Sequence, residues 1–279
     1  MKKVLKSFIL IINYKTFIIT ILGVLSTYLS DRYNITANFP DMLVGVAIVF
    51  PVVFSIGAAY NRRENALKNF ADFKGHAIAM FYAARDWPEI KDSGINGRLR
   101  SLLKDLIKDI KAFLQARLRK EMIIDEKSIY RKFSDLSQLT MELRKVGLQS
   151  GEISRISQYV SKMIIAFDNL TIVHKYRTPI TLRAYSKVFI WSFPIIYGPY
   201  FAYNFKMYTP LLYYVIPVLY SFILVSLDNI QDHLENPFDD IGEDDIHFRS
   251  KEIIELMMTD EKPEIDPIAP SEELPAVQE

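Results

Sequence analysis

Three long runs without a charged residue constrain this chain of 279 residues more than any other feature. They are Met42–Tyr60 with 19 residues, Val188–Phe205 with 18 and Met207–Leu227 with 21. A helix that spans the hydrocarbon core of a bilayer needs about 20 predominantly apolar residues. The alternative is a buried helix of a soluble protein, which rarely sustains so long an uncharged run. The runs therefore favour membrane-spanning helices.

A fourth apolar run, Thr16–Leu29, has only 14 residues. It reaches spanning length if the ammonium of Lys15 extends to the membrane surface and Phe8–Tyr14 joins the helix, which gives a span of about 8–29. The alternative is a secretory signal. Lys15 interrupts the apolar core of such a signal, and no cleavage site of small residues follows. We therefore count four spans.

The net charge of +1 conceals a strong partition along the chain. The charge is +3 over residues 1–60, +10 over 61–185 and −12 over 186–279. The basic residues of the middle block are scattered among acidic ones and form no nucleic-acid recognition motif, so we expect no nucleic-acid partner. The positive-inside rule accounts for them better. It places both termini and residues 61–185 in the cytoplasm, and the loop Ser30–Asp41 outside.

Between Asn61 and Tyr185 the pattern becomes that of amphipathic helices. One apolar face is formed by Leu99, Leu102, Leu103, Leu106, Ile107, Ile110, Phe113 and Leu114. Breaks are expected at Trp87-Pro88, Asp92–Gly97, Asp125–Lys127 and Gly147–Gly151. About four helices result, with no strand pattern. The predicted fold class is all-α: a four-span helical membrane protein with a cytosolic helical bundle.

This interpretation divides the chain into five parts. They are 1–60 with an N-terminal helix and the first two spans, the cytosolic helical region 61–185, the third and fourth spans in 186–227, an acidic segment with a C-terminal helix in 228–258, and a disordered tail rich in Pro and Glu in 259–279.

The sequence argues against several kinds of chemistry. The absence of cysteine excludes a disulfide scaffold, a thiolate nucleophile and a Cys-based zinc or iron–sulfur site. No Gly-rich phosphate loop and no hydrolase or zinc-protease motif occurs. Asp228, Asp232 and His233 could share a metal on one helix turn, but adjacent residues of a helix point apart. We assign no catalytic residue, expect no enzyme and require no cofactor.

Three stretches resemble the bestrophins, a family of pentameric anion channels with bacterial members. The first runs from Leu43 to Arg62 and is similar to the family's second span, although Arg63-Glu64 replace two tryptophans. The second is Arg177-Thr178-Pro179-Ile180, before the third span. The third and most specific combines Tyr208-Thr209-Pro210-Leu211 with Leu227-Asp228 and Leu234-Glu235-Asn236-Pro237-Phe238, where Asp239 replaces the family's glycine. These departures indicate a divergent member.

The resemblance implies a homopentamer in which the second span lines a narrow neck with apolar rings spaced four residues apart. The matching positions here are Val46, Phe50 and Phe54. Such stacked rings can gate a pore by dewetting; without the resemblance, a lipid-facing or packing stripe is the simpler interpretation. The other matching motif positions are Tyr60, Arg62, Pro179, Thr209, Pro210, Asp228, Glu235, Asn236, Pro237 and Phe238.

Animal members of the family bind calcium at acidic residues after the N-P-F motif. The resemblance therefore makes Asp240, Asp244 and Asp245 candidate Ca²⁺ ligands, since carboxylates suit this hard cation. The segment lacks the spacing of an EF-hand loop, and a solvated acidic surface is the alternative interpretation.

The sequence thus favours a multi-pass channel of the cytoplasmic membrane that passes chloride or other small anions. Its expected partners are the lipid bilayer, further copies of the chain and permeating inorganic ions. The main alternative is a membrane-anchored helical scaffold or sensor without a pore, in which 61–185 is the output region. A small-molecule transporter is a third option, supported only by prolines inside the spans.

Overall fold

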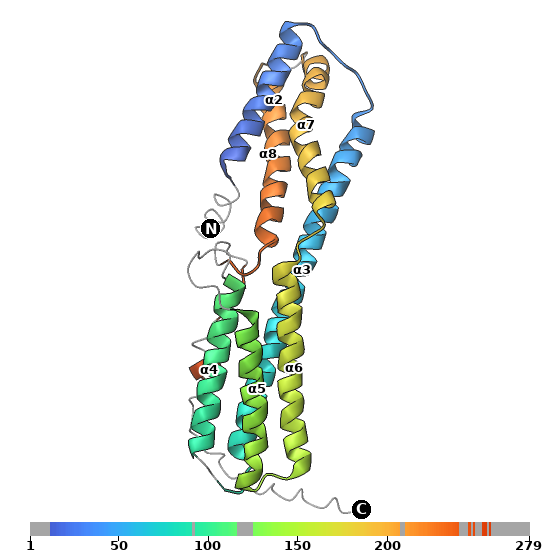
Figure 1. Ribbon diagram of the computed structural model, residues 1–279. Helices are drawn as coiled ribbons and strands as arrows, with labels where there is room; N and C mark the ends of the chain where they lie inside the picture. Colours follow the sequence, from blue (N-terminus) through green and yellow to red (C-terminus); the bar gives the residue numbers. More distant parts are fainter. Residues whose placement is uncertain are drawn as a thin grey trace, which may run out of the picture. The chain divides into compact units, whose positions relative to one another are not determined.

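The computed structural model describes residues 12–90, 93–115, 125–206, 210–239, 245, 246, 248, 253–255 and 257. Its main helices are α2 (Tyr14–Arg32), α3 (Asp41–Asp86), α4 (Ser93–Gln115), α5 (Glu126–Glu142), α6 (Ser150–Lys175), α7 (Ile180–Asn204) and α8 (Pro210–Leu234), with a short 3₁₀ helix at Leu143–Val146 (Figure 1). Within these described ranges there is no strand. The all-α prediction is confirmed there.

The helices outlast the apolar runs from which they were predicted. Helix α3 continues for 26 residues beyond Tyr60 to Asp86, and α8 continues past Asp228 to Leu234. Two segments, Gly45–Asp86 and Tyr213–Leu234, are long and apolar enough to cross a membrane by length and composition. Helices α2 and α7 have 19 and 25 residues.

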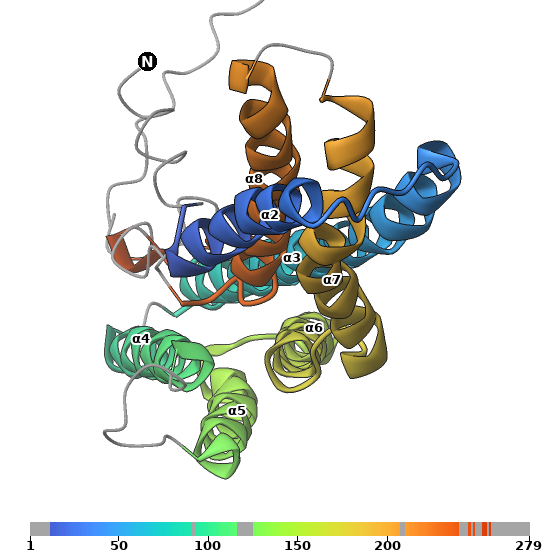
Figure 2. The ribbon, with the colours of Figure 1, turned by 90° about the horizontal axis from the view of Figure 1, so that it is seen from above.

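The chain forms two compact units, which are described separately. The first unit comprises residues 1–73, 110–126 and 162–248, and the second 74–109, 127–161 and 249–279. In the first unit α2, α7 and α8 pack against one another, and Figure 2 shows α2 crossing α8. The apolar core between these helices and α3 consists of Ile19, Ile48, Val52, Ile190, Phe193, Tyr197, Phe201, Leu224 and Val225.

Two close backbone contacts allow α2 to pack tightly in the first unit. A Cβ atom built on Gly198 of α7 would lie 2.1 Å from the Oγ of Ser26 and 2.9 Å from its carbonyl carbon. A Cβ on Gly23 of α2 would lie 2.7 Å from the Oγ of Ser221 on α8. Small residues let helix backbones approach closely where water is absent and packing has to supply the attraction. Both glycines are therefore required by packing.

The second unit is built on the predicted amphipathic helices. Leu99, Leu103 and Leu106 are each at most 1% exposed, as the apolar face of α4 predicts. Helix α4 begins at Ser93 and α6 at Ser150, inside two of the predicted breaks. Gly147 ends the 3₁₀ helix with a φ of 87°, a left-handed conformation that glycine adopts at little cost.

Charged side chains occupy the outer face of the second unit. The guanidinium of Arg98 hydrogen-bonds to Glu142 on α5 and lowers the pKa of that carboxyl below its ordinary value. Arg100 lies over the ring of Phe81 at 5.4 Å, and Arg155 over that of Trp87 at 5.9 Å. Exposed ion pairs and cation–π contacts of this kind each contribute about 1 kcal/mol or less. The unit is held mainly by its apolar core.

Candidate functional site

An exposed apolar stripe runs along the first half of α3. Val46, Phe50 and Phe54 are 49%, 58% and 60% exposed, although all three side chains are large and apolar. Residues four apart lie on the same face of a helix, and the rings of Phe50 and Phe54 meet edge to face with centroids 5.1 Å apart. The predicted neck residues therefore form one continuous apolar surface.

The opposite face of α3 explains why this stripe points outward. Ile48 and Val52 are buried to 1% and 0% exposure in the core against α7 and α8. Because these residues fix the rotation of the helix, the positions at 46, 50 and 54 must face away from the core. A contiguous apolar surface on a helix needs lipid or another protein surface to cover it. The geometry is compatible with a pore lining and equally with a packing surface.

A cavity of about 520 Å³ lies beside the stripe, between α3, α7 and α8. Val46 and Phe50 form part of its wall, together with Met42, Gly45, Ile48, Val49, Phe193, Tyr197, Tyr200, Phe201, Phe205, Tyr220, Ile223, Leu224 and Leu227. The lining is almost entirely apolar and aromatic. The neck candidates therefore have open space on one side, into which a ring could turn.

Arg62 anchors α3 about two helical turns beyond Phe54. Its Nε donates a hydrogen bond of 3.2 Å to the backbone carbonyl of Glu235, after the end of α8. Its Nη2 donates to the carbonyl of Val173 in the last turn of α6. One family-motif arginine thus binds the carboxyl ends of two helices, where unpaired carbonyls favour a cation.

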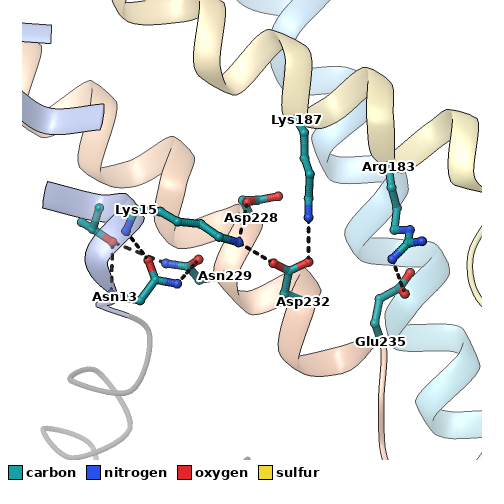
Figure 3. Close-up of polar contacts among 9 residues, drawn as sticks. Asn13, Lys15, Arg183, Lys187, Asp228, Asn229, Asp232 and Glu235 are labelled. Atoms are coloured by element: carbon teal, nitrogen blue, oxygen red, sulfur yellow. Dashed lines mark hydrogen bonds and ion pairs between the residues drawn. The ribbon is translucent and has the colours of Figure 1, made fainter. Parts of the chain in front are cut away.

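The side chain of Glu235 makes a second connection at the same place. Its carboxylate lies 3.2 Å from Nη1 of Arg183 on α7 (Figure 3). The Glu235 side chain is only 2% exposed, so its charge depends on this partner. The motif residues Arg62 and Glu235 therefore act together as a structural joint between α3, α6, α7 and α8, which their separation in the sequence does not reveal.

A further charged cluster, which the sequence did not predict, lies one turn before Glu235. Nζ of Lys15 on α2 is 2.8 Å from Asp232 and 3.8 Å from Asp228. Nζ of Lys187 on α7 is 3.3 Å from the other oxygen of Asp232 (Figure 3). Lys15 interrupts an apolar run, and a charge in such a position needs a partner. That interruption was the signal that could have indicated this cluster.

Asparagine side chains extend the cluster to the start of α2. Nδ2 of Asn13 donates to Oδ1 of Asn229 at 2.7 Å, and the Asn229 amide donates to Thr16 at 3.4 Å. Asn13 is also the N-cap of α2, where its side chain accepts from the backbone N–H of Lys15 at 2.9 Å. The start of α2 is thereby tied to α8 by neutral hydrogen bonds as well as by charge.

The metal alternative at Asp228, Asp232 and His233 finds no support in this geometry. The carboxylate of Asp232 is engaged by two lysines, one at each oxygen. In the part of the chain that the structure describes, no group of three His, Asp or Glu side chains could hold a metal ion.

The N-P-F segment folds back onto the first unit. Phe238 is fully buried, and its ring lies 5.9 Å from that of Phe248 and 6.4 Å from the imidazole of His174. The backbone N–H of Ile246 donates to the carbonyl of Pro237 at 2.8 Å. Asn236 donates from Nδ2 to Asp239 at 2.9 Å. His174 lies in the last turn of α6, as the sequence predicted.

The remaining predicted residues are placed as follows. Of the calcium candidates, Asp245 is described and buried at 8% exposure, whereas Asp240 and Asp244 lie outside the described residues. Thr209 also lies outside them, and Pro210 is the first residue of α8. Pro179 is the N-cap of α7, Tyr60 is 51% exposed on α3, and Asp228 is buried at 3%.

Comparison with known proteins gives a match in structure but not in sequence. No protein-family model and no curated protein matches the sequence. A variant of a membrane protein superposes with a TM-score of 0.74 at 14% identity, over 88% of this chain and 96% of that one. Two crystal structures of a bacterial bestrophin homologue from Klebsiella pneumoniae, one of them a variant, both superpose with a TM-score of 0.72.

Those two structures are 15% and 14% identical to this chain, and the alignments cover 88% of it and 98% and 96% of theirs. Likeness over nearly the whole of both chains at such low identity is a likeness of fold. The chain has the bacterial bestrophin fold, with a strongly diverged sequence. The resemblance suggested by the motifs is confirmed at that level.

Proposed function

We propose that this protein is a pore-forming ion channel, assembled as a homopentamer in the cytoplasmic membrane. The observation that supports the proposal best is the exposed stripe of Val46, Phe50 and Phe54 on a helix whose fold context is that of a bacterial bestrophin. Five copies of this stripe around an axis would form three stacked apolar rings. A narrow apolar constriction holds no continuous water column when closed and conducts when widened.

The proposed topology has four spans. Helices α2, α7, α8 and the first half of α3 cross the membrane, and both termini lie in the cytoplasm. The apolar segments of α3 and α8 support two of these spans by length. The excess of basic residues in 61–185 supports the cytoplasmic placement of that region. The cluster of Lys15, Lys187 and Asp232 then lies at the cytoplasmic ends of the spans.

The permeating ions in this proposal are chloride and other small anions. The stripe residues carry no charge, so the choice of sign rests on the bestrophin resemblance. Calcium is included as a regulatory ligand of the acidic segment after Phe238, held by Asp240, Asp244 and Asp245. Carboxylate oxygens there would supply the hard ligands that calcium prefers.

Current through a planar bilayer that contains purified protein tests the function directly. We expect a steady conductance, and under a KCl gradient a reversal potential close to that of chloride. A potential close to that of potassium would overturn the anion assignment and leave the channel. Complete absence of current from wild type and from Phe50→Ala would overturn the channel itself.

Chemical cross-linking in membranes separates the channel from the membrane-anchored scaffold. A ladder that ends at five copies supports the pentamer, because five equivalent interfaces close a ring. A pattern that ends at two copies supports the scaffold.

A further inference from the structure

A shallow apolar groove runs along the outer side of α2 and α8. It has a volume of about 520 Å³ and is lined by Thr20, Ile21, Val24, Leu25, Tyr28 and Tyr214. Ile21 is 64% exposed and Leu25 47%, so these side chains reach the surface rather than the core. The groove lies on a different helix pair from the stripe of α3, and the proposed pore does not use it.

The polar groups of the groove are gathered at one end. Tyr28 and Tyr214 are the lining tyrosines, 50% and 37% exposed, and they face the groove from α2 and α8. Aromatic rings with one polar tip are typical of the interface between hydrocarbon and headgroups. This end of the groove therefore has the character of a membrane interface, whereas Ile21, Val24 and Leu25 have that of the hydrocarbon layer.

A cation follows the tyrosines on the same side of α2. Arg32 comes four residues after Tyr28 and eleven after Ile21, spacings that keep all three on one helix face. Arg32 is exposed and makes no salt bridge within the described part of the chain, in contrast to its neighbour Asp31, which pairs with Lys206 at 2.9 Å. A guanidinium presents a planar set of donors that matches a phosphate group.

We propose that this groove binds a phospholipid of the bilayer, with preference for an anionic headgroup. The acyl chain lies against Ile21, Val24 and Leu25. The tyrosine hydroxyls lie at the level of the glycerol esters, and Arg32 binds the phosphate. The choice of a lipid over a second protein copy follows from the order of the groups along the groove: apolar, then aromatic and hydroxylic, then cationic. This is the order of groups in a phospholipid, with the charge sign reversed.

The inference rests on the proposed membrane insertion, and the test is designed to separate the two. Because the chain has no cysteine, Leu25→Cys and Ile18→Cys each provide a single thiol for a small fluorophore. Ile18 is 46% exposed on the same helix but does not line the groove. Each labelled protein is reconstituted in phosphatidylcholine vesicles that contain either brominated phosphatidylglycerol or brominated phosphatidylcholine at the same mole fraction, and quenching is compared.

We expect the fluorophore at Leu25→Cys to be quenched more strongly by the anionic lipid, with an apparent affinity about fivefold higher, as one arginine near the headgroups would provide. Arg32→Gln should abolish this preference and Arg32→Lys should retain part of it. The fluorophore at Ile18→Cys should be quenched equally by both lipids.

Three results would overturn the proposal. If Ile18→Cys is quenched but Leu25→Cys shows no preference, the groove does not select a lipid, and membrane insertion stands. If Arg32→Gln leaves the preference unchanged, Arg32 does not bind the headgroup. If Leu25→Cys resists quenching and cross-links between chains, a second copy covers the groove. Absence of quenching at both positions, without cross-linking, would instead refute membrane insertion.

Discussion

Arg183 and Glu235 form an ion pair of 3.2 Å in which the carboxylate is almost completely buried, at 2% exposure, while the arginine is 20% exposed. The backbone carbonyl of Glu235 accepts a second arginine, Arg62, at 3.2 Å. Through this one residue the end of α8 is connected to α7 and to α3, the helix that carries the apolar stripe. A change at Glu235 should therefore affect both stability and the position of that stripe.

Replacement of Glu235 by alanine should lower the melting temperature of the detergent-purified protein substantially. Removing one partner of a buried pair leaves the other charge poorly solvated and costs about 3 kcal/mol. The control is Glu142→Gln, which removes a pair whose arginine, Arg98, is 55% exposed and well screened by water. Equal melting temperatures for the two variants would show that the Arg183 to Glu235 pair has no special role.

Gly198→Ala should separate α2 from α7. The new Cβ would stand 2.1 Å from Oγ of Ser26 and 2.9 Å from its carbonyl carbon, so we expect a loss of about 1 to 3 kcal/mol in the free energy of unfolding. Ser26→Gly in the same chain should restore only part of it, because the backbone contact remains.

Gly57→Ala is the matched control for this prediction, since a Cβ there meets nothing within 4 Å. It should be neutral or raise stability by up to about 1 kcal/mol, because alanine favours helix. A melting temperature for Gly198→Ala equal to that of Gly57→Ala would contradict the close packing.

Lys15→Gln should destabilise the protein more than Lys187→Gln. Both lysines bind Asp232, but Lys15 is closer, at 2.8 Å against 3.3 Å, and its side chain is less exposed, at 22% against 39%. A double-mutant cycle with Asp232→Asn should give a coupling of about 1 kcal/mol for Lys15 and less for Lys187. The reverse order would show that α7, rather than α2, depends on this cluster.

Phe50→Ala and Phe54→Ala should each raise the open probability in bilayer recordings, since a smaller ring widens an apolar constriction and lets water enter. Val49→Ala is the control. Val49 is 42% exposed on the same helix but lies off the stripe. If Val49→Ala opens the channel and the two phenylalanine variants conduct like wild type, a different face of α3 lines the pore.

Replacing free Ca²⁺ by a chelator should change the current if the acidic segment binds calcium. The combined Asp240→Asn, Asp244→Asn and Asp245→Asn variant should abolish that response, because the neutral amides no longer supply the anionic oxygens that Ca²⁺ binds. Wild-type current that is the same with calcium and with chelator would remove calcium from the proposed function.

The helices and their apolar faces could be predicted from the sequence because they depend on local periodicity. The buried positions of α4, the breaks before α4 and α6, and the grouping of Val46, Phe50 and Phe54 on one face all follow from residue spacing. The length of α3 was not predicted. Polar residues after Tyr60 indicated the end of an apolar run, but polarity alone does not end a helix.

The partners of the charged residues could not be predicted. Lys15 and Asp232 are separated by 217 residues, and Arg62 and Glu235 by 173. The motifs marked Arg62, Asp228 and Glu235 as notable without indicating what they bind, and Lys187 carried no signal beyond its place at the end of an apolar run.

The sequence by itself determined that this chain is helical, that long segments of it are apolar enough for a membrane, and that one face of α3 carries a regular apolar stripe. Each of these is a property of neighbouring residues. Only the tertiary structure decided that Gly198 meets Ser26, that Glu235 joins three helices and that α2 and α8 enclose a groove ending at Arg32. These contacts depend on how helices rotate and approach once their apolar faces are packed, and no local pattern contains that information.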